Sequence, residues 1–309
     1  MKSFAARVRD ALAREEAPKP CCRRAEWTGL ALSLGAVSYL GGGGIRLSLR
    51  SDHPGTVRRM MRMLRDDFAV QPDLRIADVN RLGGRRTYRV LLEGDDARQV
   101  LEKLELTARK RAIPVHCRGR RCCRGAFLRG MFLGAGTMSD PEKGYLLEFV
   151  LHEEPIARSL ASFLAGEGIL AGVVERKGAW VVYVKEGEGI LQVLSAIGAH
   201  GAILDMENTR ILRDARNRAN RAANCDAANI TKMLEASDRQ MEAIARIEGT
   251  IGLSALPNVL REIAVERKRR PDASVEDLGQ ALDPPVGKSG VYHRLRRIEA
   301  IAQTLQKER

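Results

Sequence analysis

One eighteen-residue segment occurs twice in this chain, 101 positions apart and without a gap. Residues 21–38 read CCRRAEWTGLALSLGAVS, and residues 122–139 read CCRGAFLRGMFLGAGTMS. Eight of the 18 positions are identical, which is too many for chance at one fixed offset. We therefore predict that residues 1–206 hold a tandem repeat, with one copy at about 20–107 and the other at about 121–206.

The segments that follow the two copies also match in their hydrophobic pattern. Each copy predicts a helix that stops at a glycine, Gly35 or Gly136, followed by strands and helices in the order α-β-β-α-β-β-α. The later helices are expected at 54–68, 95–106, 155–166 and 189–197, and the strands at 45–50, 74–79, 87–92, 145–151, 169–175 and 180–185. The expected fold class is α+β, with a pseudo-twofold axis between the copies.

Small side chains recur at every fourth position of each repeat helix. They are Ala25, Gly29 and Ser33 in the first copy and Ala126, Gly130 and Gly134 in the second. Because glycine inside a helix costs about 1 kcal/mol relative to alanine, such a stripe needs a packing reason. We expect the two stripes to face each other and to let the helix backbones approach closely.

Charge is unevenly distributed along the chain. The net charge is +13, and residues 1–130 carry 28 basic against 14 acidic residues, whereas residues 131–207 carry 5 against 11. This balance favours a protein with a polyanionic partner, either nucleic acid or a membrane surface, over a generic acidic cytosolic enzyme. Residues 1–16 predict an amphipathic helix rather than a secretory signal, and the uncharged stretch 27–45 is too glycine-rich for a membrane span. We expect a cytoplasmic, nucleoid-associated protein.

A basic segment at 107–124 joins the two copies. It holds seven basic residues and no acidic one. Two interpretations stay open, namely a solvated surface linker and a set of phosphate contacts. The candidate phosphate contacts are Arg109, Lys110, Arg111, Arg118, Arg120 and Arg121.

The C-terminal residues 251–309 have the pattern of a helix-turn-helix, and a helical linker is expected at 207–250, broken near 224–226. A first helix is expected to be capped by Ser254 and to bury Val259, and a second to start with a capping box at Ser274. A third helix after Gly287 would bury Val291, Leu295, Ile298 and Ala302. Its opposite face would bind DNA. The candidate DNA-binding residues are Ser274, Lys288, Ser289, Tyr292, His293, Arg294, Arg296 and Arg297.

The chain has six cysteines, of which four form the adjacent pairs Cys21-Cys22 and Cys122-Cys123. These spacings lack the CxxC…CxxC pattern of a zinc site. The favoured interpretation is small packed thiols with no metal and no cofactor. A redox or metal role stays open as the less favoured alternative.

The nine-residue segments WTGLALSLG (27–35) and LRGMFLGAG (128–136), with the α/β order around them, resemble the LAGLIDADG homing-endonuclease fold. The resemblance implies that the residue before the last glycine of each segment should be an acid that holds a divalent metal. Those residues are here Leu34 and Ala135, so no catalytic residue is assigned. We expect a nuclease-like shell without nuclease chemistry, and hence no enzyme.

Five segments together resemble the WhiA family of bacterial transcription regulators. They are CCRRAE (21–26), CCRGAFLRG (122–130), SDPEK (139–143), NRAAN (220–224) and PPVGKSGVYHRLRRI (284–298). The resemblance implies a degenerate LAGLIDADG domain followed by a helix-turn-helix, control of sporulation, cell division and chromosome segregation, and a WhiB-type iron–sulfur regulator and RNA polymerase as partners. The chain departs from the family pattern at Gly287, where the family has Ser, and at Tyr292, where it has Asn.

The sequence therefore predicts a sequence-specific, non-enzymatic regulator that binds double-stranded DNA and no membrane. The alternative that stays open is an active or RNA-directed endonuclease or maturase of the LAGLIDADG type. A small-molecule sensor role for residues 1–206 also stays open, because a pocket cannot be recognised from sequence.

Overall fold

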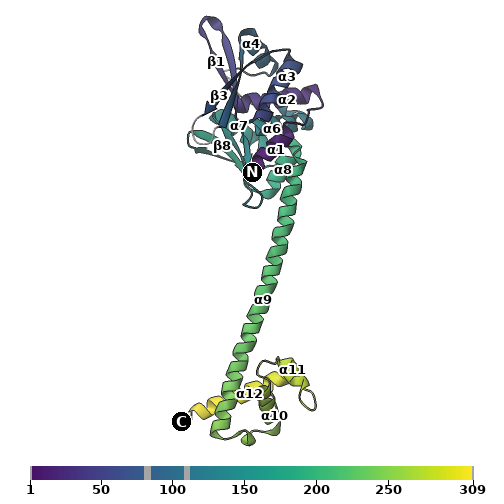
Figure 1. Cartoon of the computed structure of the whole chain (residues 1–309), viewed down its shortest axis with the longest axis vertical. Helices are drawn as coiled ribbons and strands as arrows, with labels where there is room; N and C mark the ends of the chain where they lie inside the picture. The colour runs from purple at the N-terminus through teal and green to yellow at the C-terminus, as the bar shows by residue number, and fades with distance from the viewer. Residues whose placement is uncertain (1, 80–84, 108–111, 308–309) are drawn as a thin grey trace. The chain divides into compact units, whose positions relative to one another are not determined.

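The structure is a computed structural model, and it describes residues 2–79, 85–107 and 112–307. The chain divides into two compact units, Met1–Ile211 and Leu212–Arg309, which we describe separately. Figure 1 shows the helices and strands of both units and labels several of them by the names used below.

The first unit contains the predicted tandem repeat. After α1 (Phe4–Leu12), the first copy comprises α2 (Pro20–Leu34), β1 (Gly35–Tyr39), β2 (Ile45–Ser51), α3 (Pro54–Phe68), β3 (Asp73–Val79), β4 (Arg85–Glu93) and α4 (Gly94–Lys103). After α5 (Val115–Arg118), the second comprises α6 (Arg121–Ala135), β5 (Gly136–Met138), β6 (Leu147–Leu151), α7 (Glu154–Gly166), β7 (Gly172–Arg176), β8 (Ala179–Val184) and α8 (Gly187–Ile197). The order α-β-β-α-β-β-α is therefore confirmed in both copies.

Each copy forms one antiparallel four-stranded sheet. The strand orders are β1-β2-β4-β3 and β5-β6-β8-β7, which are equivalent. The registers are equivalent too, because Gly35 pairs with Leu49 and Gly136 pairs with Phe149. Inward residues of the central strands, such as Leu47 and Leu147, are buried in one continuous core that both copies share. The α+β pseudo-twofold fold is thus shown.

Helices α2 and α6 contact each other at their backbones. A Cβ added at Gly29 would overlap the carbonyl oxygen of Phe127, and one added at Gly130 would overlap that of Glu26. Further along, a Cβ at Gly134 would overlap the side chain of Ser33. Because early residues of one helix face early residues of the other, the two helices run parallel and begin together. The small side chains thus allow an approach that larger side chains would prevent.

A buried ion pair lies beside this helix contact. Glu26 in α2 is fully buried, and the guanidinium of Arg59 from α3, 4% exposed, donates two hydrogen bonds to its carboxylate, the one from Nη2 at 2.9 Å. Nη1 of Arg129 on α6 lies 3.9 Å from the same carboxylate. A buried charge pair of this kind is costly to break, because one partner would be left unpaired inside the core.

The second unit is helical. It contains the C-terminal part of α9 (His200–Thr250), the short 3₁₀ turn Leu253–Ala255, α10 (Asn258–Arg269), α11 (Val275–Gln280) and α12 (Lys288–Lys307). Its core is aliphatic and is made by Ala243, Ile244, Ile247, Leu256, Leu260, Ile263, Ala264, Leu278, Leu282, Val291, Leu295, Ile298 and Ala302. The prediction of buried positions in the third helix is confirmed.

Three local predictions for this unit are wrong. The break expected near 224–226 is absent, because α9 is one helix from His200 to Thr250; asparagine and aspartate weaken a helix without ending it. Ser254 lies in the 3₁₀ turn and does not cap α10, which starts at Asn258 after Pro257. Val259 is 49% exposed, because the buried stripe of α10 is centred on Leu260, Ile263 and Ala264 and Val259 lies about 100° around the helix from Leu260.

Within the described ranges, no helix is both long enough and apolar enough to cross a membrane.

Replacing Gly130 by Ala should destabilise the first unit. The added methyl group would overlap the backbone of α2, and overpacking of a rigid contact costs about 1–3 kcal/mol. Gly201→Ala is the matched control, because Gly201 is helical with no atom within 4 Å of its Cβ position. The control should be stabilising by about 0.4–1 kcal/mol. Denaturant unfolding of the full chain measures both, and equal stabilities of the two variants would contradict the backbone contact.

Candidate nucleic-acid interface

Helix α12 presents a basic and polar face over its first three turns. Val291, Leu295 and Ile298 anchor the helix in the core. Residues on the opposite side and its flanks are exposed, namely Lys288, Ser289, Tyr292, His293, Arg296 and Arg297, while Arg294 is half-buried. We call these seven residues the α12 face. No acidic residue occurs in residues 288–298, so this face is uniformly suited to phosphate oxygens and the acceptors of base edges.

Two members of the α12 face contact each other. The guanidinium carbon of Arg296 lies 5.7 Å from the ring centre of Tyr292, one turn earlier on the helix. This cation–π contact restricts the Arg296 side chain before any ligand binds. The Tyr292 ring itself is 52% exposed. Tyr292 thus influences the face both by its own hydroxyl group and by the position of Arg296.

The turn between α11 and α12 depends on a glycine. The backbone N–H of Val286 donates to the carbonyl oxygen of Gly279 at 2.9 Å. A Cβ added at Gly279 would overlap the carbonyl oxygen of Val286 and would lie 3.1 Å from a methyl group of Val291. The absence of a side chain at Gly279 therefore lets the chain return closely along α11, which fixes where α12 starts.

A buried arginine connects α10 to the start of α11. Arg267 is only 2% exposed, and its Nη1 donates to the carbonyl oxygens of Pro271 at 3.1 Å and Ala273 at 2.7 Å. The hydroxyl of Ser237, on α9, donates to the same carbonyl of Pro271 at 2.5 Å. Burial lowers the pKa of Arg267 from its usual value. The connection before α11 is thus held by side chains from two other helices.

Ser274 is used for capping. The expected capping box is present, because the Ser274 Oγ accepts from the backbone N–H of Asp277 at 3.1 Å and donates to its carboxylate at 2.7 Å. The Ser274 hydrogen bonds hold the pKa of the Asp277 carboxyl below its usual value. Any DNA contact of Ser274 would compete with this cap.

The outer face of the first sheet carries a row of arginines that the sequence reasoning missed. Arg89 on β4 pairs directly with Arg50 on β2 and with Arg75 on β3, and all three are exposed. Like charges directly opposite each other on a sheet are unfavourable unless an anion neutralises them. Arg75 already donates to the Asp73 carboxylate at 2.9 Å, so the unfavourable pair is chiefly Arg50 with Arg89. Strand alternation in residues 45–50 and 87–92 is the signal that could have placed Arg50 and Arg89 on the outer face.

The equivalent row of the second sheet is apolar. The shared register makes Val150, Val181 and Val174 the counterparts of Arg50, Arg89 and Arg75. Val150 and Val174 are 41% and 44% exposed, whereas Val181 between them is buried at 4%. The two halves of the first unit therefore offer chemically different faces on equivalent backbones.

The basic linker is only partly described. Arg109, Lys110 and Arg111 lie outside the described residues. Arg118, Arg120 and Arg121 are exposed around the start of α6, and the Arg118 guanidinium lies 6.0 Å from the Phe163 ring centre. The segment is more than a solvated connection, because Ile113 and Cys117 are buried in the core.

The positions that would carry nuclease acids are the last residues of the repeat helices. Leu34 ends α2 and Ala135 ends α6, and both are half-buried and pack against the core. Asp140 is not a substitute, because its carboxylate accepts from the backbone N–H of Glu142 at 3.0 Å in a turn. Among the described residues, the two that end these helices therefore have no side-chain oxygen for a hard metal ion.

The opposite ends of the same helices bring four cysteines together. The Sγ atoms of Cys21, Cys22, Cys122 and Cys123 all lie within 4.8 Å of one another. Burial and the neighbouring thiols raise the pKa of Cys22 and of Cys123 to about 12. Burial also acts to raise the pKa of Cys21, but hydrogen bonds from Cys123, Cys22 and Arg120 lower it overall. Sequence spacing could not reveal this group, because it forms between two helices 101 residues apart.

Replacing Gly279 by Ala should loosen the α11–α12 turn. The added methyl group would overlap the Val286 backbone, so we expect destabilisation of the second unit by about 1–3 kcal/mol. Amide hydrogen exchange across α11 and α12 in the full chain would detect it as faster exchange. Gly249→Ala, at a helical position with no atom within 4 Å of an added Cβ, is the control and should leave that exchange unchanged or slow it, because alanine favours the helix. Equal exchange in the two variants would show that the turn does not need Gly279.

Comparison with known proteins places these features in one family. The chain matches the WhiA N-terminal LAGLIDADG-like domain over residues 20–107, the WhiA LAGLIDADG-like domain over 124–216 and the WhiA C-terminal HTH domain over 219–302. It is 37% identical to a probable cell division protein WhiA of Alkaliphilus metalliredigens, over 97% of each chain. It is 39% identical to a protein of the same description from Heliobacterium modesticaldum, over 99% of this chain and 98% of the relative.

Solved structures agree on the fold. The crystal structure of full-length DUF199/WhiA from Thermatoga maritima superposes with a TM-score of 0.62 at 23% identity, covering 98% of this chain and 99% of the other. The N-terminal LAGLIDADG domain of DUF199/WhiA gives a TM-score of 0.53 at 20% identity, covering 64% of this chain and 91% of that one. With its two LAGLIDADG-like copies and its C-terminal helix-turn-helix, the chain belongs to the WhiA family.

Proposed function

We propose that this protein is a sequence-specific, DNA-binding transcriptional regulator of cell division, without nuclease activity. The observation that carries the proposal is the α12 face, an exposed set of donors on the last helix of a helix-turn-helix. The printed descriptions of its relatives, which are probable cell division proteins, support the process that it controls. Roles in sporulation and chromosome segregation are part of the same proposal and rest on the family resemblance.

Base reading is assigned to the side of α12 directly opposite its core contacts. Ser289, Tyr292, His293 and Arg296 lie there, and each can donate a hydrogen bond to a base edge in the major groove. Lys288, Arg294 and Arg297 lie toward the edges of the helix and would contact phosphates. Because Tyr292 contacts Arg296, the aromatic residue would also affect which base Arg296 reads.

Phosphate binding in the first unit is assigned to the outer face of the first sheet. Arg50, Arg89 and Arg75 form one row there, and a polyanion would offset the repulsion between Arg50 and Arg89. The exposed Arg118, Arg120 and Arg121 are further candidate phosphate contacts, and Arg109, Lys110 and Arg111 are retained as candidates from the sequence. The apolar row of the second sheet does not suit DNA and is open to a protein partner.

Two observations argue against a nuclease. The helix ends that would supply metal-binding acids carry Leu34 and Ala135, and Asp140 is engaged in a turn. Among the described residues, the only group of three or more His, Cys, Asp or Glu side chains placed to share a metal is the cysteine group at the other helix ends. Phosphodiester hydrolysis by metal ions needs oxygen ligands, which that group does not supply.

The partners and location proposed for the protein follow from DNA regulation. We propose that it acts at the nucleoid in the cytoplasm, and that RNA polymerase and a WhiB-type iron–sulfur regulator are its protein partners. These partners rest on the family resemblance, and the apolar row of the second sheet, which includes Val150 and Val174, is a surface that one of them could cover. Co-purification from the native host with and without Val150→Asp tests that assignment.

Arg296→Ala should weaken binding to the specific site by about 1–3 kcal/mol and relax selectivity at one base, if Arg296 reads that base. Arg294→Ala, which removes the same charge from a flanking position, should weaken binding to all sequences and reduce the salt dependence of affinity. Both are measured by titrating the full chain onto its site, identified by genome-wide occupancy, and onto unrelated duplex. Unchanged selectivity in the Arg296 variant would remove that residue from the reading face.

The double variant Arg50→Ala/Arg89→Ala should bind unrelated duplex DNA more weakly. The slope of log K against log salt concentration should also become shallower, by about one to two. The double variant Arg62→Ala/Arg98→Ala is the charge-matched control, because these exposed arginines lie on α3 and α4 of the same copy. The control should keep nearly the wild-type slope. Equal losses in both would mean that overall charge, and not the arginine row, attracts DNA.

A further inference from the structure

The four cysteines at the start of the repeat helices form one cluster rather than two separate pairs. Cys21 and Cys22 are the second and third residues of α2, and Cys122 and Cys123 hold the same places in α6. All six Sγ–Sγ separations are within 4.8 Å, and none of the four forms a disulfide. The Cys123 thiol also donates to the carbonyl oxygen of Cys21 at 3.7 Å. Each copy therefore contributes two sulfurs at its contact with the other copy.

This arrangement has the ligand number and spacing of a tetrahedral thiolate site. Zinc binds cysteine sulfur at about 2.3 Å, so the sulfurs of a Cys₄ site lie about 3.8 Å apart. Sulfurs within 4.8 Å of one another are therefore at most about 1 Å farther apart than that spacing. Hard cations such as Mg²⁺ prefer oxygen ligands, so the donor set selects a soft or borderline ion.

The surroundings favour the negative charge that such a site carries. Four thiolates around a divalent ion have a net charge of about −2, and the cluster lies in the first turn of two helices, near their positive dipole ends. Arg120 precedes α6 and Arg121 is its first residue. These positive groups would partly neutralise the negative charge of the thiolates.

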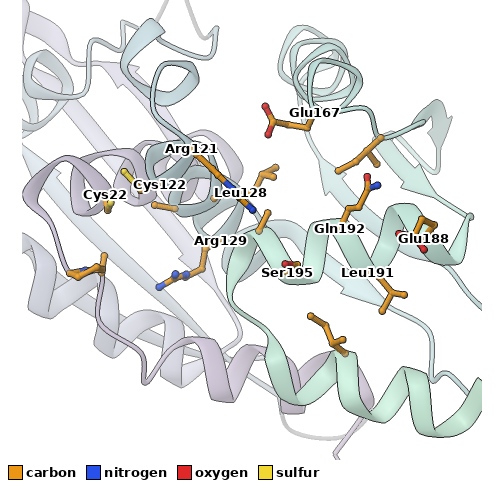
Figure 2. Close-up of a pocket in the computed structure, with 17 residues that line it drawn as sticks. Cys22, Arg121, Cys122, Leu128, Arg129, Glu167, Glu188, Leu191, Gln192 and Ser195 are labelled. Carbon is orange, nitrogen blue, oxygen red and sulfur yellow. The ribbon is translucent and has the colours of Figure 1, made fainter.

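An ion can reach the cluster from solvent. Cys122 is exposed and Cys21 is half-buried, while Cys22 and Cys123 are buried behind them. Cys22 and Cys122 line a pocket of about 890 Å³, and Figure 2 shows them at one end of it with Arg121 and Arg129 nearby. The site is thus closed on the core side and open on one side, which allows metal exchange without unfolding.

We propose that Cys21, Cys22, Cys122 and Cys123 bind one thiophilic divalent metal ion of the zinc type, which links the N-terminal ends of α2 and α6. The ion joins the two copies at their pseudo-twofold axis and has a structural role. The small residues further along the helices hold the backbones together by shape, whereas the metal holds them by coordination at the end that faces solvent. None of its four ligands belongs to the α12 face or to the arginine row of the first sheet.

The test starts from the full chain purified without chelators. Elemental mass spectrometry should find one zinc ion per chain, and the double variant Cys21→Ser/Cys122→Ser should retain only background zinc. Cys225→Ser is the matched control, because Cys225 is exposed on α9 outside the cluster and the substitution is chemically the same. The control should keep one zinc ion. The two exposed or half-exposed cysteines are chosen so that the core packing of Cys22 and Cys123 is left intact.

A second measurement does not depend on any variant folding. Zinc removed from the wild-type chain is replaced by Co²⁺, which should give sulfur-to-cobalt charge-transfer bands and the intense visible bands of tetrahedral coordination. The chelator step should also lower the Tm of the wild-type and Cys225→Ser proteins. It should leave the Tm of the double variant unchanged.

Four results would overturn the proposal. The first is a wild-type chain that holds no zinc and gives no charge-transfer bands with Co²⁺. The second is the finding of disulfides among the four cysteines in protein purified without reductant, and the third is iron with acid-labile sulfide in place of zinc. The fourth is an equal zinc content in the double variant and the control. The second would indicate redox chemistry and the third a cluster instead of a single ion.

Discussion

The backbone contact between α2 and α6 determines how the rest of the first unit is built. Because glycines at Gly29 and Gly130 bring the two helices together, their beginnings meet at one end and their last residues at the other. The cysteine pairs therefore converge at the first end, and Leu34 and Ala135 occupy the second. Each sheet then extends from its own helix in the same register. One close approach thus decides where thiols, apolar side chains and exposed sheet faces lie.

Much of the fold follows from local sequence rules. The repeat, the order of elements in both copies, the capping box at Ser274 and the buried stripe of α12 were predictable, since each depends on neighbours within one or two turns or strands. The errors have local causes as well. Asparagine and aspartate near 224–226 weaken α9 without ending it, and the buried stripe of α10 passes beside Val259 through Leu260, Ile263 and Ala264.

The candidate sites were less predictable because they depend on pairing across the fold. The arginine row requires the register between β2, β4 and β3, which no pattern within one strand specifies. The cysteine cluster requires two helices that begin side by side, and adjacent cysteines within either helix do not indicate it. The Tyr292–Arg296 contact, one turn apart on α12, is in contrast the kind of pair that helical spacing alone suggests.

The unlike rows on the two sheets bear on how a duplicated domain can change. Positions that face the shared core are similar in both halves, because residues such as Leu47 and Leu147 are both buried in it and must pack there. Arg50 and Val150 stand at equivalent places but meet only solvent or a partner, so each half could drift independently there. After a duplication, the exposed sheet face of one half can therefore acquire a new binding partner while that of the other half keeps its original one. The similarity of the two halves is therefore retained at buried positions and lost at exposed ones.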